Sequence, residues 1–245
     1  MRLPILRGVI DRRILVNFHV DPDVIARALP APFRPKLIRG VAMAGVCLIR
    51  LKQIRPKFLP AALGVSSENA AHRIAVEWEQ DGLLHEGVYI PRRDTSSRLN
   101  ALAGGRLFPG VHHHARFHVE EHDDAYCVAL ESDDGLTSLS VEARLTANLP
   151  RMSVFRSLRE ASRFFEVGSV GFSPSARAGQ FDGLELRTFN WRVQPLAVDR
   201  VESSFFDDPA LFPRGAAQFD CALLMRGVEH EWCEKPTLCC DTAAV

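Results

Sequence analysis

The chain has 245 residues, of which 47% are hydrophobic and 24% charged, as is typical of a globular protein with a buried core. Its 30 basic residues balance 30 acidic ones, so we expect no nucleic-acid partner and no attraction to an anionic membrane. No apolar run reaches the roughly 18 residues that a spanning helix needs, and the N-terminus does not resemble a secretory signal. We therefore expect a cytoplasmic protein whose six cysteines are reduced.

The first half of the chain predicts strands and one short helix. A strand over residues 13–20 leads to a helix that begins after Asp21, an N-cap residue followed by proline. A second strand is expected over residues 41–52. Residues 74–78 alternate apolar and polar side chains and, with residues 86–90 beyond an Asp-Gly turn, predict a hairpin.

The second half continues in the same way. Residues 95–103 predict a short helix that ends at a Gly-Gly pair, and a strand follows over residues 111–120. An Asp-Asp-Gly turn predicts a second hairpin between residues 126–130 and 139–145. Residues 153–166 have the clearest helical repeat. Further strands are expected at 184–191, 198–205 and 219–229. The prediction is one mainly β, mostly antiparallel domain over residues 1–245 with a few short helices, with α+β as the alternative class.

A run of histidines lies at the start of the strand expected over residues 111–120. Successive side chains of a strand point to opposite faces, so His113 shares a face with the apolar residues of this strand. His113 is therefore expected to point into the core, near a barrel mouth. Its two interpretations are a buried structural histidine and a functional group that faces a pocket.

The opposite face of the same strand offers a metal site as an alternative. His112 and His114 share that face, and Glu120 and Glu121 follow as possible further ligands, in a pattern close to that of cupins. The same face is polar and expected to be solvated. A surface cluster is therefore preferred, with no metal, and a metal-binding cupin-like protein remains an alternative.

Three segments in order are similar to a known family. A Leu-Pro-Ala-Pro-Phe run at residues 29–33 is followed by Ser-Ser-Glu-Asn-Ala at residues 66–70 and by Gly105-Arg106 just before a strand. This order resembles the acetoacetate decarboxylase-like superfamily, and residues 66–117 resemble a bacterial family of unknown function within it. The match is strongest over residues 10–146. It implies an antiparallel barrel with an interior site, and a possible homo-oligomer.

The decarboxylases of that superfamily use a lysine that forms a Schiff base with the substrate ketone, together with a glutamate and an arginine. By the resemblance, the glutamate falls on Glu68 and the arginine on Arg12, with Arg13 as the near rival. The lysine falls on His113 and its neighbour on His114. Imidazole has no primary amine, so Schiff-base decarboxylation is not expected at this position.

Lys52 and Lys57 lie near a strand end, within reach of a barrel mouth, and both are expected to be solvated loop residues. The remaining chemistry is acid–base catalysis on a small oxo acid or related carboxylate, without a cofactor. The alternative is a non-catalytic domain that binds a small carboxylate or carbonyl compound. The predicted catalytic residues are His113 and Glu68, and the predicted substrate-binding residues are Arg12, Arg93, Arg106 and His114.

Overall fold

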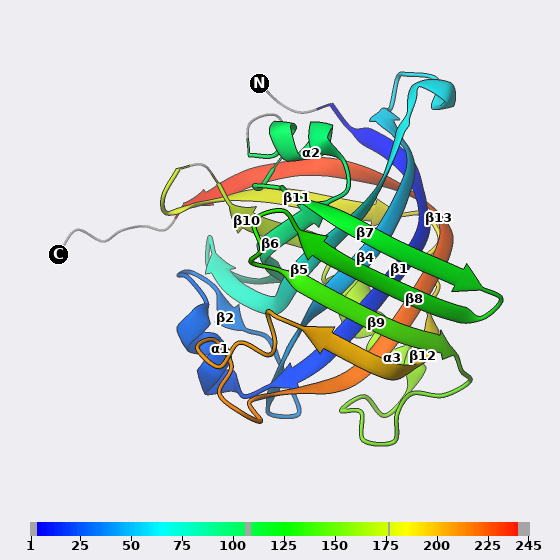
Figure 1. Ribbon diagram of the computed structural model, residues 1–245. Helices are drawn as coiled ribbons and strands as arrows, with labels where there is room; N and C mark the ends of the chain where they lie inside the picture. Colours follow the sequence, from blue (N-terminus) through cyan, green and yellow to red (C-terminus); the bar gives the residue numbers. More distant parts are fainter. Residues whose placement is uncertain (1–3, 106–108, 176, 240–245) are drawn as a thin grey trace.

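A computed structural model describes residues 4–105, 109–175 and 177–239. The chain is mainly β, as predicted, and its helices are short (Figure 1). The strands are β1 (Leu6–Val20), β2 (Arg34–Pro35), β3 (Leu37–Ile38), β4 (Val41–Pro56), β5 (Val65–Gln80), β6 (Leu83–Thr95), β7 (His113–His122), β8 (Ala125–Ser132), β9 (Ser138–Leu145), β10 (Val170–Pro174), β11 (Gln180–Thr188), β12 (Gln194–Ser203) and β13 (Ala217–Cys239). The helices are α1 (Pro22–Ala28), the 3-10 helix η1 (Ala61–Leu63), α2 (Arg98–Ala103) and α3 (Leu158–Val167).

The strands close into a ring. Strand pairing runs in the order β6, β7, β8, β9, β12, β13, β1, β4 and β5, and β5 pairs again with β6. All these pairings are antiparallel except that of β6 with β7. Strands β10 and β11 connect β6 to β13 by a second route. Strands β13, β1, β4, β5 and β6 are therefore common to both closures, and we call them the shared wall. Figure 1 shows β7, β8 and β9 side by side as one wall, with β1 and β4 behind them.

The shared wall has apolar residues on both faces, because each face is covered. The inner face, toward the ring interior, includes Ile14, Leu48 and Leu224 in one large buried cluster. The outer face carries a second cluster, against which α3 packs through Ala161 and Phe165. Strands buried on both faces can be almost continuously apolar, as residues 42–49 of β4 are.

The elements follow the sequence prediction with shifts at their ends. Both predicted hairpins and the helix capped by Asp21 are confirmed. Helix α3 begins at Leu158 rather than at residue 153, because Ser157 caps its first turn while the Ser153 hydroxyl donates to Asp220. Strand β10 was not predicted. None of the helices described here is long and apolar enough to cross a membrane.

Candidate functional site: a charged layer inside the ring

Four charged residues form a row across adjacent strands of the inner face. Each lies two residues beyond an apolar inner-face residue of its own strand, so strand alternation turns it into the ring. Arg12 of β1 pairs in register with Arg226 of β13 on one side and with Arg50 of β4 on the other. Arg50 in turn pairs with Glu68 of β5. Three arginines therefore lie side by side, an arrangement that is unfavourable without counter-charges.

The counter-charges come from Glu68 and from the opposite wall. Arg12 donates from Nη2 to Glu68 at 2.6 Å and from Nη1 to Glu121 of β7 at 2.8 Å. Arg50 also donates to Glu68 and forms an ion pair with Glu121 at 2.8 Å. Arg226 donates to Glu121 at 3.2 Å and to the hydroxyl oxygen of Tyr126 at 3.0 Å. All four carboxylate oxygens are thus held by guanidinium groups.

We call Arg12, Arg50, Glu68, Glu121, Tyr126 and Arg226 the charged layer. Its three guanidinium groups and two carboxylates leave one positive charge uncompensated. The exposed fraction of the side chain rises from 0% for Arg12 to 46% for Arg226, so the layer opens to solvent on the Arg226 side. The Nε of Arg12 is buried and has no hydrogen-bond partner within the described part of the chain.

A further ion pair borders the layer. Lys52 donates to Asp11 at 2.9 Å, and Arg50 lies 3.6 Å from the other oxygen of that carboxylate. Burial raises the pKa of Asp11, but the Lys52 hydrogen bond and the nearby cations outweigh it and lower that pKa. Burial likewise lowers the pKa of Arg50, and its hydrogen bond to Glu68 with the surrounding carboxylates raises it overall. Both groups are therefore charged at neutral pH.

The structure places Arg12, and not Arg13, beside Glu68. Arg13 points to the outer face, where its Nε donates to Cys47 Sγ at 3.1 Å and its guanidinium lies near Trp191. Of the predicted site residues, Arg12 and Glu68 are thus brought together, in direct contact, as the resemblance implied.

His113 lies elsewhere. It shares the inner face with Ala115, as strand parity predicted, but its Nδ1 lies 3.0 Å from Asp134, and its side chain is 36% exposed. No hydrogen bond or ion pair in the described ranges joins His113 to Glu68 or Arg12. Glu121 lies eight residues beyond His113 on the same face of β7, a distance of about 26 Å along the strand. Glu121, rather than His113, is the β7 residue that contacts Arg12.

The other predicted binding residues are also outside the layer. Arg93 donates to the Ser173 hydroxyl on β10 at 2.9 Å. His114 lies 2.7 Å from Asp133 in the turn after β8. Arg106 lies outside the described residues. The roles predicted for all of these residues remain predictions.

The residues of the alternative metal site have separate partners. The Nδ1 of His112 contacts the carbonyl oxygen of Gly110, and His114 pairs with Asp133. Glu121 is bound by arginines of the charged layer. No group of three or more His, Cys, Asp or Glu side chains in the ranges that the structure covers is placed to hold a metal ion.

The lysines are not placed for Schiff-base chemistry. Lys52 and Lys57 are 51% and 52% exposed and pair with Asp11 and Glu231. Lys36 and Lys235 also have carboxylate partners. A Schiff base requires an amine that is free to attack the ketone, and each of these amines is engaged by a carboxylate.

His72 is a buried inner-face residue that the sequence reading did not single out. It lies on β5, four residues from Glu68, with its ring 4.7 Å from that of Phe205. Neither ring nitrogen has a hydrogen-bond partner in the described structure. Burial, with a smaller contribution from the charge of Arg92, lowers the pKa of His72 to about 3, so this imidazole is neutral at physiological pH.

The sequence also missed Arg50, Tyr126 and Arg226 as parts of the site, and it considered Glu121 only as a metal ligand. Strand parity contained a signal for Glu121, because it falls on the same face as His113. The two arginines end apolar runs, but only the strand register shows that they flank Arg12.

Comparisons with known proteins agree with this architecture. The family model of DUF2071, described as an uncharacterized conserved protein, matches residues 10–202. This range is longer than residues 10–146, over which the sequence resemblance was strongest. No curated protein matches the chain.

Solved structures match over almost the whole chain. An acetoacetate decarboxylase-like enzyme from Sphingomonas wittichii RW1 is 12% identical with a TM-score of 0.58, and the match covers 98% of this chain and 94% of that one. Acetoacetate decarboxylase from Legionella pneumophila is 12% identical with a TM-score of 0.60, over 95% and 87% of the two chains. The enduracididine biosynthesis enzyme MppR complexed with pyruvate is 10% identical with a TM-score of 0.59, over 98% and 91%. Identities this low show the fold alone. The chain belongs to the DUF2071 family of uncharacterized proteins and has the acetoacetate decarboxylase-like fold.

Proposed function

We propose that the charged layer binds the carboxylate group of a small oxo acid or a related organic acid. The observation that carries this proposal is the Nε of Arg12, a fully buried donor to which no described residue provides an acceptor, in a layer with one positive charge in excess. A buried guanidinium donor left unpaired is costly, and a carboxylate is the group that guanidinium donors bind best.

The accessible side of the layer supports the same ligand class. Arg226 is the most exposed of the three arginines, and it stands next to Arg12 in the strand register. An entering carboxylate meets Arg226 first and then the buried Arg12. MppR, a protein of the same fold, has been solved with pyruvate, which makes pyruvate a suitable probe.

Binding without Schiff-base formation is the form of the proposal that the geometry favours. Guanidinium groups hold both oxygens of Glu68 and both of Glu121, so these glutamates position the arginines. The second candidate function is acid–base catalysis on the bound acid. It is favoured by Tyr126, whose hydroxyl is a proton-bearing group within the layer, 3.0 Å from Arg226.

The proposal is tested by titrating pyruvate into the protein with calorimetric detection. We expect saturable binding that Arg226→Met weakens by about tenfold or more, because a charge-assisted hydrogen bond is lost. Arg200→Met, which removes an exposed arginine paired with Glu202, is the matched control and leaves affinity unchanged. No saturable binding, or equal loss in both variants, contradicts the proposal.

The two candidate functions are separated by following the methyl protons of pyruvate in heavy water. Deuterium incorporation faster than in buffer, lost in Tyr126→Phe, shows proton abstraction next to the carbonyl group. Saturable binding without faster exchange identifies a binding domain.

A further inference from the structure

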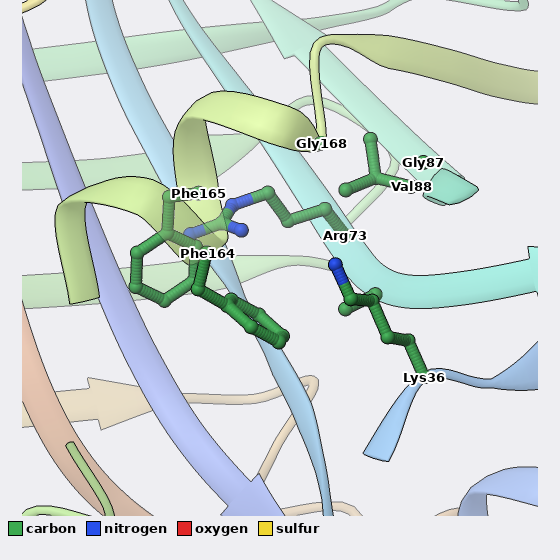
Figure 2. A pocket seen from close by; sticks show the side chains of 8 residues that line it. Lys36, Arg73, Gly87, Val88, Phe164, Phe165 and Gly168 are labelled. Carbon is green, nitrogen blue, oxygen red and sulfur yellow. The ribbon is translucent and has the colours of Figure 1, made fainter. Parts of the chain in front are cut away.

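On the outer face, the C-terminal end of α3 and strands β5 and β6 border a small hollow that is partly open to solvent. Arg73 and Lys36 line it together with Val88, Phe164, Phe165 and Gly168. Figure 2 shows the Arg73 guanidinium against Phe165 and the Lys36 ammonium group entering the same hollow. This hollow is separate from the charged layer, because Arg73 and Glu68 are an odd number of residues apart on β5 and point to opposite faces.

Arg73 is a buried cation in the wall of this hollow. It is 6% exposed, and no carboxylate of the described residues forms an ion pair with it. Its Nη2 donates to the side-chain oxygen of Asn17, and its guanidinium carbon lies 4.9 Å from the Phe165 ring centroid. Its Nε is buried and has no partner among those residues. A buried charge in this state is strongly unfavourable unless a counter-charge is supplied.

The neighbouring groups do not supply that charge. Lys36 is balanced by its own ion pair with Glu86, and Arg13 adds a further cation on the same face. The C-terminus of α3 contributes about half a negative charge, which offsets only part of one guanidinium. Burial lowers the pKa of Arg73 to about 10, so the group is still protonated at neutral pH.

The rest of the lining is apolar. Val88, Ala75 and the rings of Phe164 and Phe165 provide aliphatic and aromatic surface next to the two cations. The Lys36 ammonium group already lies 4.6 Å from the centre of the Phe164 ring. A ligand that suits both parts has one anionic end and a short apolar tail.

We propose that this hollow is a second binding site, which takes a short-chain aliphatic carboxylate with its anionic end at Arg73 and Lys36 and its tail against Val88 and Phe164.

The test uses methyl-labelled protein and butyrate as the probe. Val88 methyl signals report on the hollow, and Leu224 methyl signals report on the ring interior. We expect a saturable butyrate-dependent shift of Val88, with an affinity that Lys36→Met lowers by about tenfold. Lys57→Met removes a lysine with a comparable ion pair on another surface and leaves the Val88 titration unchanged.

Arg73→Lys keeps the charge but not the planar guanidinium, and it is expected to weaken butyrate binding while the chain still folds. A Val88 signal that does not shift, a shift that fails to saturate, or a titration that Lys36→Met leaves unaltered overturns the proposal. A shift confined to Leu224 likewise overturns it, while leaving the proposed function of the charged layer standing.

Discussion

Replacing His72 by leucine is expected to make the protein less sensitive to acid. His72 is fully buried in the ring interior against Phe205 and Phe206, and neither of its ring nitrogens is hydrogen-bonded within the described chain. Leucine has a similar volume and keeps the apolar contacts. The substitution therefore removes a titratable group and little else.

The size of the effect comes from proton linkage. Burial, and secondarily Arg92, lowers the pKa of His72 from 6.5 to about 3 on folding. The unfolded chain then takes up the proton first as the pH falls, so the native state loses stability from pH 6.5 downward, until the folded group also titrates near pH 3. Between pH 7.5 and pH 5 this loss amounts to about 2 kcal/mol. The His72→Leu variant does not undergo this loss of stability.

Urea unfolding of both proteins at the two pH values measures this directly. We expect the stability of the variant relative to the natural sequence to increase by about 2 kcal/mol from pH 7.5 to pH 5. Contributions from the other histidines cancel in the difference, and His118→Gln, at an exposed histidine, is the control with no such change. A difference that is the same at both pH values refutes the assignment of His72 as a buried, neutral and unpaired imidazole.

Three other changes have definite expected outcomes. Arg12→Met breaks the buried pairs of the charged layer and is expected to lower the free energy of unfolding in urea by about 3 kcal/mol; a loss below about 1 kcal/mol would show that these pairs are solvated. Gly45→Ala places a Cβ 2.3 Å from the carbonyl oxygen of Val16, so we expect a loss of about 3 kcal/mol and a lower melting temperature, and an unchanged melting temperature would contradict this packing. The Arg92 hydrogen bond, despite some opposing burial, lowers the pKa of Asp134 from 3.8. Asp134→Asn is therefore expected to cost about 1 kcal/mol at pH 6, a cost that persists near pH 4 and declines only as the pH falls well below 3.8, whereas a cost already lost at pH 4 would exclude the ion pair.

Interactions between residues close in the sequence were sufficient to predict the turns, the helix caps and the faces of the strands. The Asp21 cap and the two Asp-Gly hairpins depend on neighbouring residues only, and all three are confirmed. Strand β10 was missed because its five residues have no alternation, and its place depends on pairing with β6 and β11. Helix α3 was predicted too long, since the apolar repeat does not show that Asp220, far along the chain, holds Ser153 outside it.

The candidate site was predictable only in part. The resemblance placed Glu68 and Arg12 in one site, and their side chains are in contact. Strand alternation predicted that His113 faces the ring interior, but it did not predict where His113 lies along the barrel axis. The distance from His113 to Arg12 could therefore not be inferred. Arg50 and Arg226 join the layer through strand register, which depends on contacts between residues more than thirty positions apart.

The central claim is that the charged layer is a carboxylate site, and a crystal structure of the protein soaked with pyruvate tests it most directly. We expect density for pyruvate inside the ring, with its carboxylate within about 3 Å of Arg226 or of the Nε of Arg12. The same crystals of Arg226→Met should lack it. Density for water alone in the layer, with pyruvate absent or bound only elsewhere, would contradict the account.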